Sequence, residues 1–138
     1  MDCEFIFRKS FGRVISLDPF GNVFFKRFYQ RLFVSPEVRE KFRNVDMSKQ
    51  YIALERSLLL LVEFFVDKKP GKALEKIAVR HTKSGLDIPP RMYDLWLEAM
   101  LETVREMDPD QNDEVLRAWK TVLSGGIKYM TDVYEQSN

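Results

Sequence analysis

The stretch LEKIAVRHTKSGL (residues 74–86) decides how this chain of 138 residues folds, and it contains the only histidine, His81. Leu74, Ile77 and Ala78 recur at steps of one and three residues, so they lie on one face of a predicted helix. His81 follows Ile77 by four residues and Ala78 by three, which places it on the same inward face. The sequence therefore predicts a helix with a single inward-facing histidine near its C-terminal end.

Helical spacing of apolar residues continues through nearly all of the chain, without strand alternation, internal repeats or a domain linker. Asp18 followed by Pro19 predicts the N-cap and the first position of the second helix. The predicted helices cover residues 5–15, 18–35, a short turn at 36–42, then 46 or 48 to 67, 72–82, 89–107 and from about 112 onward. We therefore expect one all-α domain of six or seven helices over residues 1–138.

Composition excludes several classes of protein. Lys and Arg number 22 and Asp and Glu 21, so we expect neither nucleic acid nor a membrane surface as a partner. The lone cysteine, Cys3, cannot form an intrachain disulfide and suits a reducing compartment. No signal peptide is recognisable, so we expect a cytoplasmic protein. The most apolar run, residues 58–66, is interrupted by Glu63 and is too short to span a bilayer.

Motifs for common enzyme chemistry are missing from the sequence. There is no Gly-rich phosphate loop, no CxxC and no HExxH, and no Ser or Cys can be nominated as a partner for His81. The 11 phenylalanines against 6 glycines are unusual, and they suit either a tightly packed helical core or the walls of a pocket for a large flat ligand. His81 alone has an ordinary interpretation as a helix-end or core histidine.

A haem pocket is the alternative interpretation of the same residues. Haem iron needs one axial nitrogen on one side, flat apolar walls and, optionally, a polar group on the other side. His81 supplies the nitrogen, and Phe42 is placed to lie against a macrocycle. Gln50 and Tyr29 offer hydrogen-bond donors from the opposite wall. This combination favours a haem pocket over an isolated histidine.

The order of these features resembles the globin family, most closely its bacterial single-domain and sensor-type members. The segments that carry the resemblance are FYQRLF (28–33), SPEVREKF (35–42), DMSKQYIAL (46–54), LEKIAVRH (74–81), MYDLWLEAML (92–101) and AWK (118–120). Single pieces are weak signals, but their order is specific, with a histidine 31 residues after a Gln and a Phe six after a Pro. The resemblance implies a globin-like fold of six to seven helices around a haem pocket.

The resemblance also assigns roles to the central site residues. It implies that His81 is the proximal iron ligand, that Phe42 is the phenylalanine stacked on the haem, and that Gln50 is the distal residue. Leu54 would be its apolar distal neighbour and Tyr29 the distal tyrosine. Tyr–Gln pairs in similar proteins donate hydrogen bonds to the bound gas, and buried donors slow ligand loss.

Further candidates follow His81 around the next turn. Ile88 and Tyr93 are expected to contact the haem, and Trp96 is a weaker candidate. Arg80 and Lys83 flank the histidine, so each is either a partner of a haem propionate or a solvated base. Phe24, Phe25, Phe33 and Trp119 are expected in the core.

Two departures from the family pattern leave alternatives open. Tyr29 precedes Pro36 by seven residues where the pattern usually has eight, so either Tyr29 or Phe28 faces the ligand. We favour Tyr29, which keeps the FY dipeptide in place. Flavohaemoglobin-like proteins also pair a tyrosine with a glutamate beside the proximal histidine. Tyr93 matches the tyrosine, but Tyr134 occupies the glutamate position, which weakens the case for oxidative haem chemistry.

The expected cofactor is a non-covalent b-type haem, because the sequence has no CxxCH attachment motif. A single histidine excludes bis-histidine coordination within one chain, so the ferrous state is expected to be five-coordinate. The expected function is reversible binding of a diatomic gas (O2, NO or CO) in transport or sensing, rather than catalysis.

Three alternatives to gas binding and one open question of assembly remain. The first alternative is an NO dioxygenase that depends on an external reductase. The second is a redox or gas-signalling module that acts on a separate partner. The third is a haem-free module, and the presence of His81 argues against it. The helices over residues 91–107 and 112–134 offer a face for a homodimer, although the core alone explains their apolar stripes.

Overall fold

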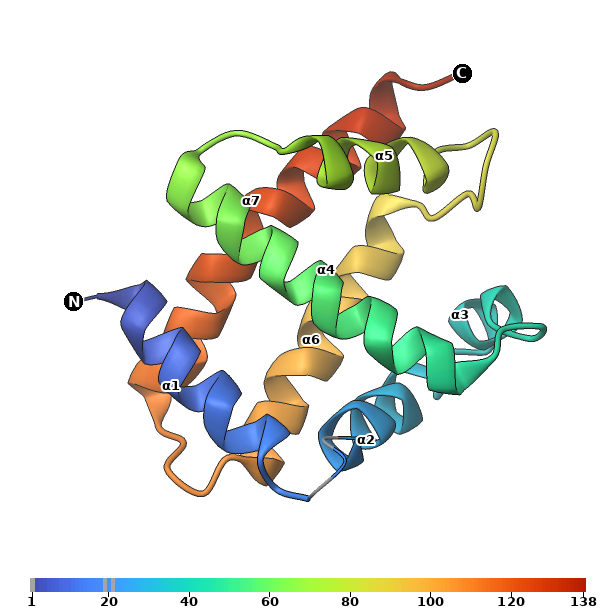
Figure 1. Ribbon diagram of the computed structural model, residues 1–138. Helices are drawn as coiled ribbons and strands as arrows, with labels where there is room; N and C mark the ends of the chain where they lie inside the picture. The colour runs from blue at the N-terminus through green and yellow to red at the C-terminus, as the bar shows by residue number, and fades with distance from the viewer. Residues whose placement is uncertain (1, 19, 21) are drawn as a thin grey trace.

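The structure is a computed structural model that describes residues 2–18, 20 and 22–138. Its described residues form seven α-helices and no strand, as Figure 1 shows. The helices are α1 (Cys3–Ile15), α2 (Val23–Leu32), α3 (Pro36–Lys41), α4 (Met47–Asp67), α5 (Lys72–Arg80), α6 (Pro90–Met107) and α7 (Asp113–Gln136). The predicted all-α architecture is therefore confirmed.

The long helices α4, α6 and α7 form the frame of the molecule. α4 crosses in front of α6 and α7 in Figure 1 and packs against α7, while α6 and α7 pack against each other. α1 packs on α7, and α2 packs on α6. α5 contacts both α7 and α4 at the end of the molecule where the chain terminates. This arrangement leaves space between α4, α5 and α6.

Side-chain caps mark the start of three helices. Side-chain oxygens of Ser35, Asp46 and Asn112 accept backbone N–H groups from the first turns of α3, α4 and α7. Pro36 occupies the first helical position of α3, where its missing N–H costs nothing. α4 ends at Asp67, and its C-cap Lys68 adopts a left-handed conformation with φ of 61°. The predicted starts near 46 or 48 and near 112 are close to the observed ones. The prediction differs at residues 36–42, where the expected short turn is the helix α3, and the helix before it ends at Leu32 rather than at Ser35.

The predicted start of the second helix is wrong. α2 begins at Val23, with Asn22 as its N-cap, and not at Asp18. The Asp18 carboxylate accepts the backbone N–H groups of Phe20 and Val23, both at 2.8 Å, so it holds the loop that leads into the helix. Pro19, predicted at the first helical position, lies outside the described residues.

The helix that carries the histidine ends earlier than predicted. α5 stops at Arg80 with His81 as its C-cap, whereas the apolar pattern predicts a helix as far as Thr82. The Thr82 hydroxyl donates to the carbonyl of Val79 at 2.7 Å, which satisfies a carbonyl that a longer helix would use. The chain turns away from α5 at this point.

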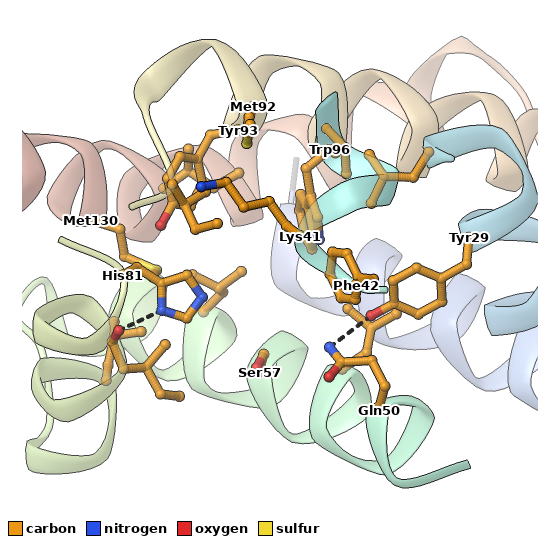
Figure 2. A pocket seen from close by; sticks show the side chains of 18 residues that line it. Tyr29, Lys41, Phe42, Gln50, Ser57, His81, Met92, Tyr93, Trp96 and Met130 are labelled. Carbon is orange, nitrogen blue, oxygen red and sulfur yellow. Dashed lines mark hydrogen bonds between the residues drawn. The ribbon is translucent and has the colours of Figure 1, made fainter. Parts of the chain in front are cut away.

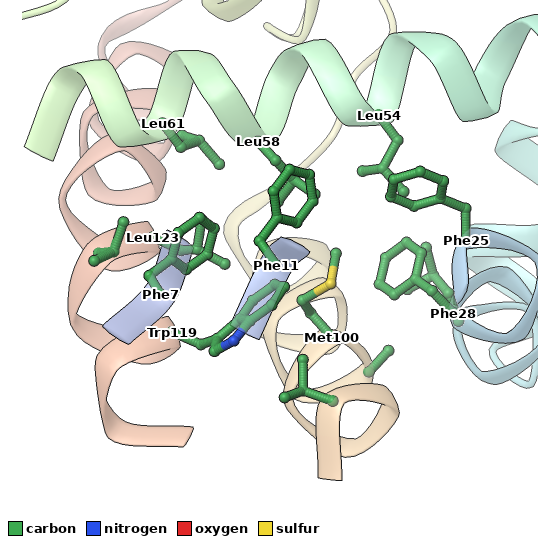
Figure 3. Close-up of a cluster of buried hydrophobic side chains, with 14 of the residues drawn as sticks. Phe7, Phe11, Phe25, Phe28, Leu54, Leu58, Leu61, Met100, Trp119 and Leu123 are labelled. Carbon is green, nitrogen blue, oxygen red and sulfur yellow. The ribbon is translucent and has the colours of Figure 1, made fainter. Parts of the chain in front are cut away.

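A cluster of buried aromatic rings joins α1, α2 and α7. The Trp119 ring lies 4.5 Å from Phe7 and 6.0 Å from Phe24, measured between ring centroids. Figure 3 shows Phe7 and Trp119 on the side of α4 from which Leu58 and Leu61 point inward. Phe24, Phe25 and Trp119 therefore belong to the core, as predicted.

A buried polar network connects this cluster to the turn between α6 and α7. Trp119 Nε1 donates to Ser10 Oγ at 2.8 Å, and Ser10 Oγ donates to Asp108 at 2.6 Å. The Arg13 guanidinium donates to both oxygens of Asp108. Burial alone would raise the pKa of Asp108, but the hydrogen bonds from Arg13 and Ser10 outweigh it and hold the pKa below its usual value.

Gly126 allows α7 to approach α4 closely. A Cβ atom at this position would overlap the side chain of Leu61. The sequence alone leaves open whether the Gly125–Gly126 pair produces a kink or a close approach. α7 continues as one helix through both residues, so the structure favours the close approach. No described helix is both long and apolar enough to cross a membrane.

Candidate functional site

A cavity lies between α4, α5 and α6, with α2 and α3 at one end (Figure 2). It contains about 860 Å³ of space free of protein atoms, part of it open to solvent. Most of the exposed lining is apolar, and no acidic side chain of the described residues contributes to it.

Eight of the nine predicted site residues line this cavity. They come from α2, α4 and α6, the C-cap positions of α3 and α5, and the loop after α5, and they are Tyr29, Phe42, Gln50, Leu54, His81, Ile88, Tyr93 and Trp96. Arg80, the ninth, is exposed and does not line the cavity. Lys83 is also exposed, and it contacts Ser137 near the C-terminus instead. The flanking bases therefore lie outside the cavity.

The His81 imidazole is fixed by its own helix. Its Nδ1 atom lies 2.7 Å from the carbonyl oxygen of Ile77, which can only accept a hydrogen bond. Nδ1 therefore carries the proton, and the lone pair of Nε2 is free. Figure 2 shows this second nitrogen turned toward the cavity.

The charge state of His81 also suits a metal ligand. Burial is the main cause that lowers its pKa, and the nearby positive charge of Arg80 acts in the same direction. The hydrogen bond to Ile77 opposes this shift without cancelling it. The imidazole is therefore neutral at neutral pH, which is the form that coordinates metals.

Tyr29 and Gln50 form a polar pair on the opposite side of the cavity (Figure 2). Gln50 Nε2 donates to Tyr29 Oη at 3.0 Å. Because the hydroxyl oxygen accepts this bond, its own hydrogen remains available for a ligand in the cavity. Burial raises the pKa of Tyr29, so the hydroxyl stays protonated.

The structure distinguishes the two candidate residues on α2. Tyr29 lines the cavity, whereas Phe28 is fully buried in the core and packs edge-on against Trp96 at 5.7 Å between centroids. Phe42, the C-cap of α3, stands beside the pair, with its ring 5.6 Å from that of Tyr29. Of the two side chains, Tyr29 is therefore the one that a ligand in the cavity would meet.

Tyr93 presents an unsatisfied hydroxyl at the cavity. Its Oη atom is buried without a hydrogen-bond partner among the described residues, and burial raises its pKa. An unsatisfied buried hydroxyl costs about 1–3 kcal/mol. A ligand in the cavity with a polar edge near Tyr93 would remove this cost.

Lys41 is a lining residue that sequence reasoning does not identify. It is the last residue of α3, and its Nζ donates to the carbonyl of Leu86 at 3.1 Å. The bond links α3 to the loop that follows His81. The remaining unpredicted lining residues are Leu32, Val38, Ser57, Leu61, Leu74, Ile77, Met92, Ile127 and Met130. Only Leu74 and Ile77 had a sequence signal, because they share a helix face with His81.

The loop after His81 is held in a tight turn. The Leu86 N–H donates to the carbonyl of Arg80 at 2.8 Å, and a Cβ atom on Gly85 would overlap that same carbonyl oxygen. Tyr134, at the position where a glutamate was considered, donates its hydroxyl to Asp87 at 2.7 Å. Tyr134 does not line the cavity, and neither does any Asp or Glu of the described residues. No described carboxylate in the cavity therefore accepts a hydrogen bond from His81 and increases its anionic character.

These features define what the cavity can bind. It offers one neutral imidazole nitrogen, a pair of hydrogen-bond donors across from it, and apolar walls between them. The described residues contain no group of three or more His, Cys, Asp and Glu side chains able to hold a metal ion by themselves. A metal that uses His81 must therefore bring its other ligands with it, as in a flat macrocycle.

Comparisons with known proteins agree with this geometry. The family model described as Globin matches residues 26–130. A crystal structure of protein PA3967 from Pseudomonas aeruginosa PAO1, described as structurally highly homologous to a human haemoglobin, superposes with a TM-score of 0.88. The two chains share 31% sequence identity, and the match covers 96% of this chain and 98% of the other. No curated protein sequence matches the chain.

Proposed function

Because the chain belongs to the globin family, we propose that it holds a non-covalent b-type haem and binds a diatomic gas (O2, NO or CO) reversibly. One observation carries the proposal: the free Nε2 of His81 faces the cavity, with the Tyr29–Gln50 pair on the other side. The buried Tyr93 hydroxyl, which lacks a partner, and the apolar lining support the fit of a flat molecule with polar edges.

The residues would hold the cofactor in distinct ways. His81 would provide the axial nitrogen, and its bond to the Ile77 carbonyl keeps the imidazole in the correct tautomer and orientation. Phe42 would lie against the macrocycle. Haem iron supplies a coordination site for the gas. The single cysteine, Cys3, lies in α1 and does not line the cavity, in keeping with non-covalent attachment.

Tyr29 and Gln50 would control how long the gas stays bound. The Tyr29 hydroxyl donates its hydrogen to the ligand, while Gln50 holds the hydroxyl oxygen in place. A donor that is buried and already oriented loses little entropy when it binds, and its hydrogen bond is strong in a site that excludes water. We therefore expect slow gas dissociation.

We propose a carrier or sensor role rather than turnover. The lining contains no carboxylate beside His81, and Tyr134 is bonded to Asp87 outside the cavity. An NO dioxygenase that uses an external reductase remains the alternative. Sustained NO consumption over many turnovers with an added reductase would support that alternative, and stoichiometric consumption would support the binding role.

The test of haem binding is the visible spectrum of the protein loaded with haem. We expect a five-coordinate ferrous form with a Soret band. His81→Gly should greatly weaken haem binding, and added imidazole should restore the band by filling the vacated space. Lys76→Gly, on the exposed side of α5, is the matched control and should keep the wild-type spectrum. An unchanged ferrous spectrum in His81→Gly would refute the assignment.

A further inference from the structure

The outward face of α4 exposes a row of aliphatic side chains. Ile52, Leu59 and Val66 are 55%, 43% and 50% exposed, and each follows the last by seven residues. Val45, seven residues before Ile52 and just ahead of the helix, is 38% exposed and extends the row. Seven residues make almost two turns at about 3.6 residues per turn, so the row runs along one side of the helix. In Figure 1 no other helix covers this side of α4.

A seven-residue repeat on an exposed helix face is the pattern of a helix that packs against another helix. The opposite face of α4 already packs into the core through Leu54, Leu58 and Leu61, which are buried. The exposed row takes no part in that packing. The exposed row is therefore in excess of what the fold of one chain needs.

Charged side chains flank the row with an uneven distribution. Lys49 and Arg56 lie in the N-terminal half of α4, and Glu63 and Asp67 lie in the C-terminal half. All four are exposed and fall on the same flank by helical spacing. None of them forms an ion pair with another described residue. Arg56 and Glu63 are seven residues apart, too far for a pair within one helix.

We propose that α4 is the interface of a homodimer in which two copies of the helix pack antiparallel about a two-fold axis at Leu59. This rotation places Leu59 against the partner's Leu59, and Ile52 against the partner's Val66. After this rotation, the charged flanks of the two helices lie on the same side of the interface and run in opposite directions. Arg56 then lies beside the partner's Glu63, and Lys49 lies near the partner's Asp67, twice in each dimer.

The charge pattern selects a second copy of this chain in that orientation. A two-fold interface must be complementary to itself, and a helix that is positive in one half and negative in the other meets this condition when reversed. A parallel two-fold arrangement would instead place the two charged flanks on opposite sides of the interface, so that they would not face each other. The row extends along one helix only, so the interface buries a small area and the dimer is weak. The dimer should therefore form only as the protein concentration rises.

α6 and α7, which the sequence offers as a dimer face, are less suitable. Their apolar residues, such as Met100, Val104 and Val122, are fully buried in the core. The only large hydrophobic side chain exposed on these two helices, among the described residues, is Leu95. The new interface also lies on the opposite side of α4 from the cavity, so it is independent of the proposed haem binding.

Sedimentation equilibrium of the full chain over a range of concentrations tests the proposal. The wild type should pass from monomer to dimer as concentration rises. Leu59→Glu places two carboxylates at the axis and should weaken the dimer about a hundredfold, because like charges facing each other across an interface cost several kcal/mol. Val79→Glu, at a 63% exposed position on α5, is the matched control and should leave dimerisation unchanged.

A charge exchange tests the orientation. Arg56→Glu and Glu63→Arg should each weaken the dimer about fivefold, as expected for exposed ion pairs. The double variant should restore the wild-type affinity, because each position again faces its opposite charge. Three results would overturn the proposal: a wild type that stays monomeric, a double variant without recovery, or a dimer weakened by Leu95→Glu and not by Leu59→Glu. Circular dichroism of each variant checks that it is folded.

Discussion

The side-chain amide of Gln50 donates a 3.0 Å hydrogen bond to the hydroxyl of Tyr29, which comes from a helix on another side of the cavity. The bond joins α4 to α2 and leaves the hydrogen of Tyr29 free to point at a ligand. Gln50 is therefore a positioning residue for Tyr29 as well as a donor in its own right.

Removal of the Tyr29 hydroxyl should speed the loss of bound gas. Tyr29→Phe deletes the donor without changing the ring, and we expect the dissociation rate of O2 to rise about tenfold or more. Stopped-flow measurement of O2 release gives the rate. Tyr51→Phe is the control, because its ring lies 6.0 Å from that of Tyr29 without lining the cavity. Equal rates in Tyr29→Phe and wild type would contradict the role of Tyr29.

Tyr93→Phe should affect the haem-free and haem-loaded proteins differently. Without haem the variant loses a buried hydroxyl that has no partner, so its free energy of unfolding should rise by about 1 kcal/mol. In the loaded protein this gain should disappear, because the wild-type hydroxyl bonds to the polar edge of the cofactor. Urea unfolding with and without haem measures both values. The same gain in both states would show that Tyr93 does not contact the cofactor.

Asp108 should make stability depend on acid pH. Its pKa is below 3.8 in the folded chain, so its ionised form stabilises the fold above that pH, and the contribution is lost as the pH falls through the lowered pKa. Asp108→Asn should be less stable at pH 7, and its Tm should fall less steeply than that of the wild type as the pH is lowered. Asp94→Asn, at an exposed position, should behave like the wild type.

Two other carboxyls, those of Asp46 and Glu106, also have lowered pKa values, and both are exposed. Hydrogen bonds from Ser48 lower the pKa of Asp46. The pKa of Glu106 is about 2 because Arg27 and Arg31 donate hydrogen bonds to it, but this group is exposed. Its contribution should be screened at about 1 M salt, where the Debye length is roughly 3 Å. The slope that persists in salt and disappears in Asp108→Asn therefore belongs to the buried carboxylate. If Asp108→Asn at high salt keeps the wild-type slope of Tm against pH, that slope does not come from Asp108.

Two glycines should respond to alanine with opposite signs. Gly85→Ala brings a Cβ onto the backbone carbonyl of Arg80, which cannot move without distorting the loop after His81, so unfolding should become easier by about 1–3 kcal/mol. Gly12→Ala, inside α1 with open space around it, should increase stability by about 0.5–1 kcal/mol. Chemical denaturation measures both. A neutral Gly85→Ala would show that the turn is loose.

Most of the helical framework could be predicted because its signals are local. Ser35, Asp46 and Asn112 cap the helices they precede through contacts within one turn. The start of α2 could not be predicted in the same way. Asp18 has the correct residue type for a cap, but its carboxylate accepts the backbone N–H of Val23, five residues away, which is beyond the two or three residues that a cap normally spans.

The site shows the same division between local and tertiary signals. Successive helical residues differ by about 100° in direction, so neighbouring side chains point to different places. Arg80 is adjacent to His81 yet lies outside the cavity, and Phe28 is adjacent to Tyr29 yet lies in the core. Lys41 could not be predicted, because its bond to Leu86 depends on how α3 meets a loop 45 residues later.

The contact between Ser10 and Trp119 has a consequence for the time at which the protein can fold. The two residues are 109 positions apart, and α1 packs mainly on α7. On the ribosome, α1 is made before α7 and must wait for it, so the aromatic cluster cannot close before α7 has emerged. Such long-range contacts slow folding and leave apolar surface exposed in the meantime. The nascent chain should depend on chaperones until α7 has emerged.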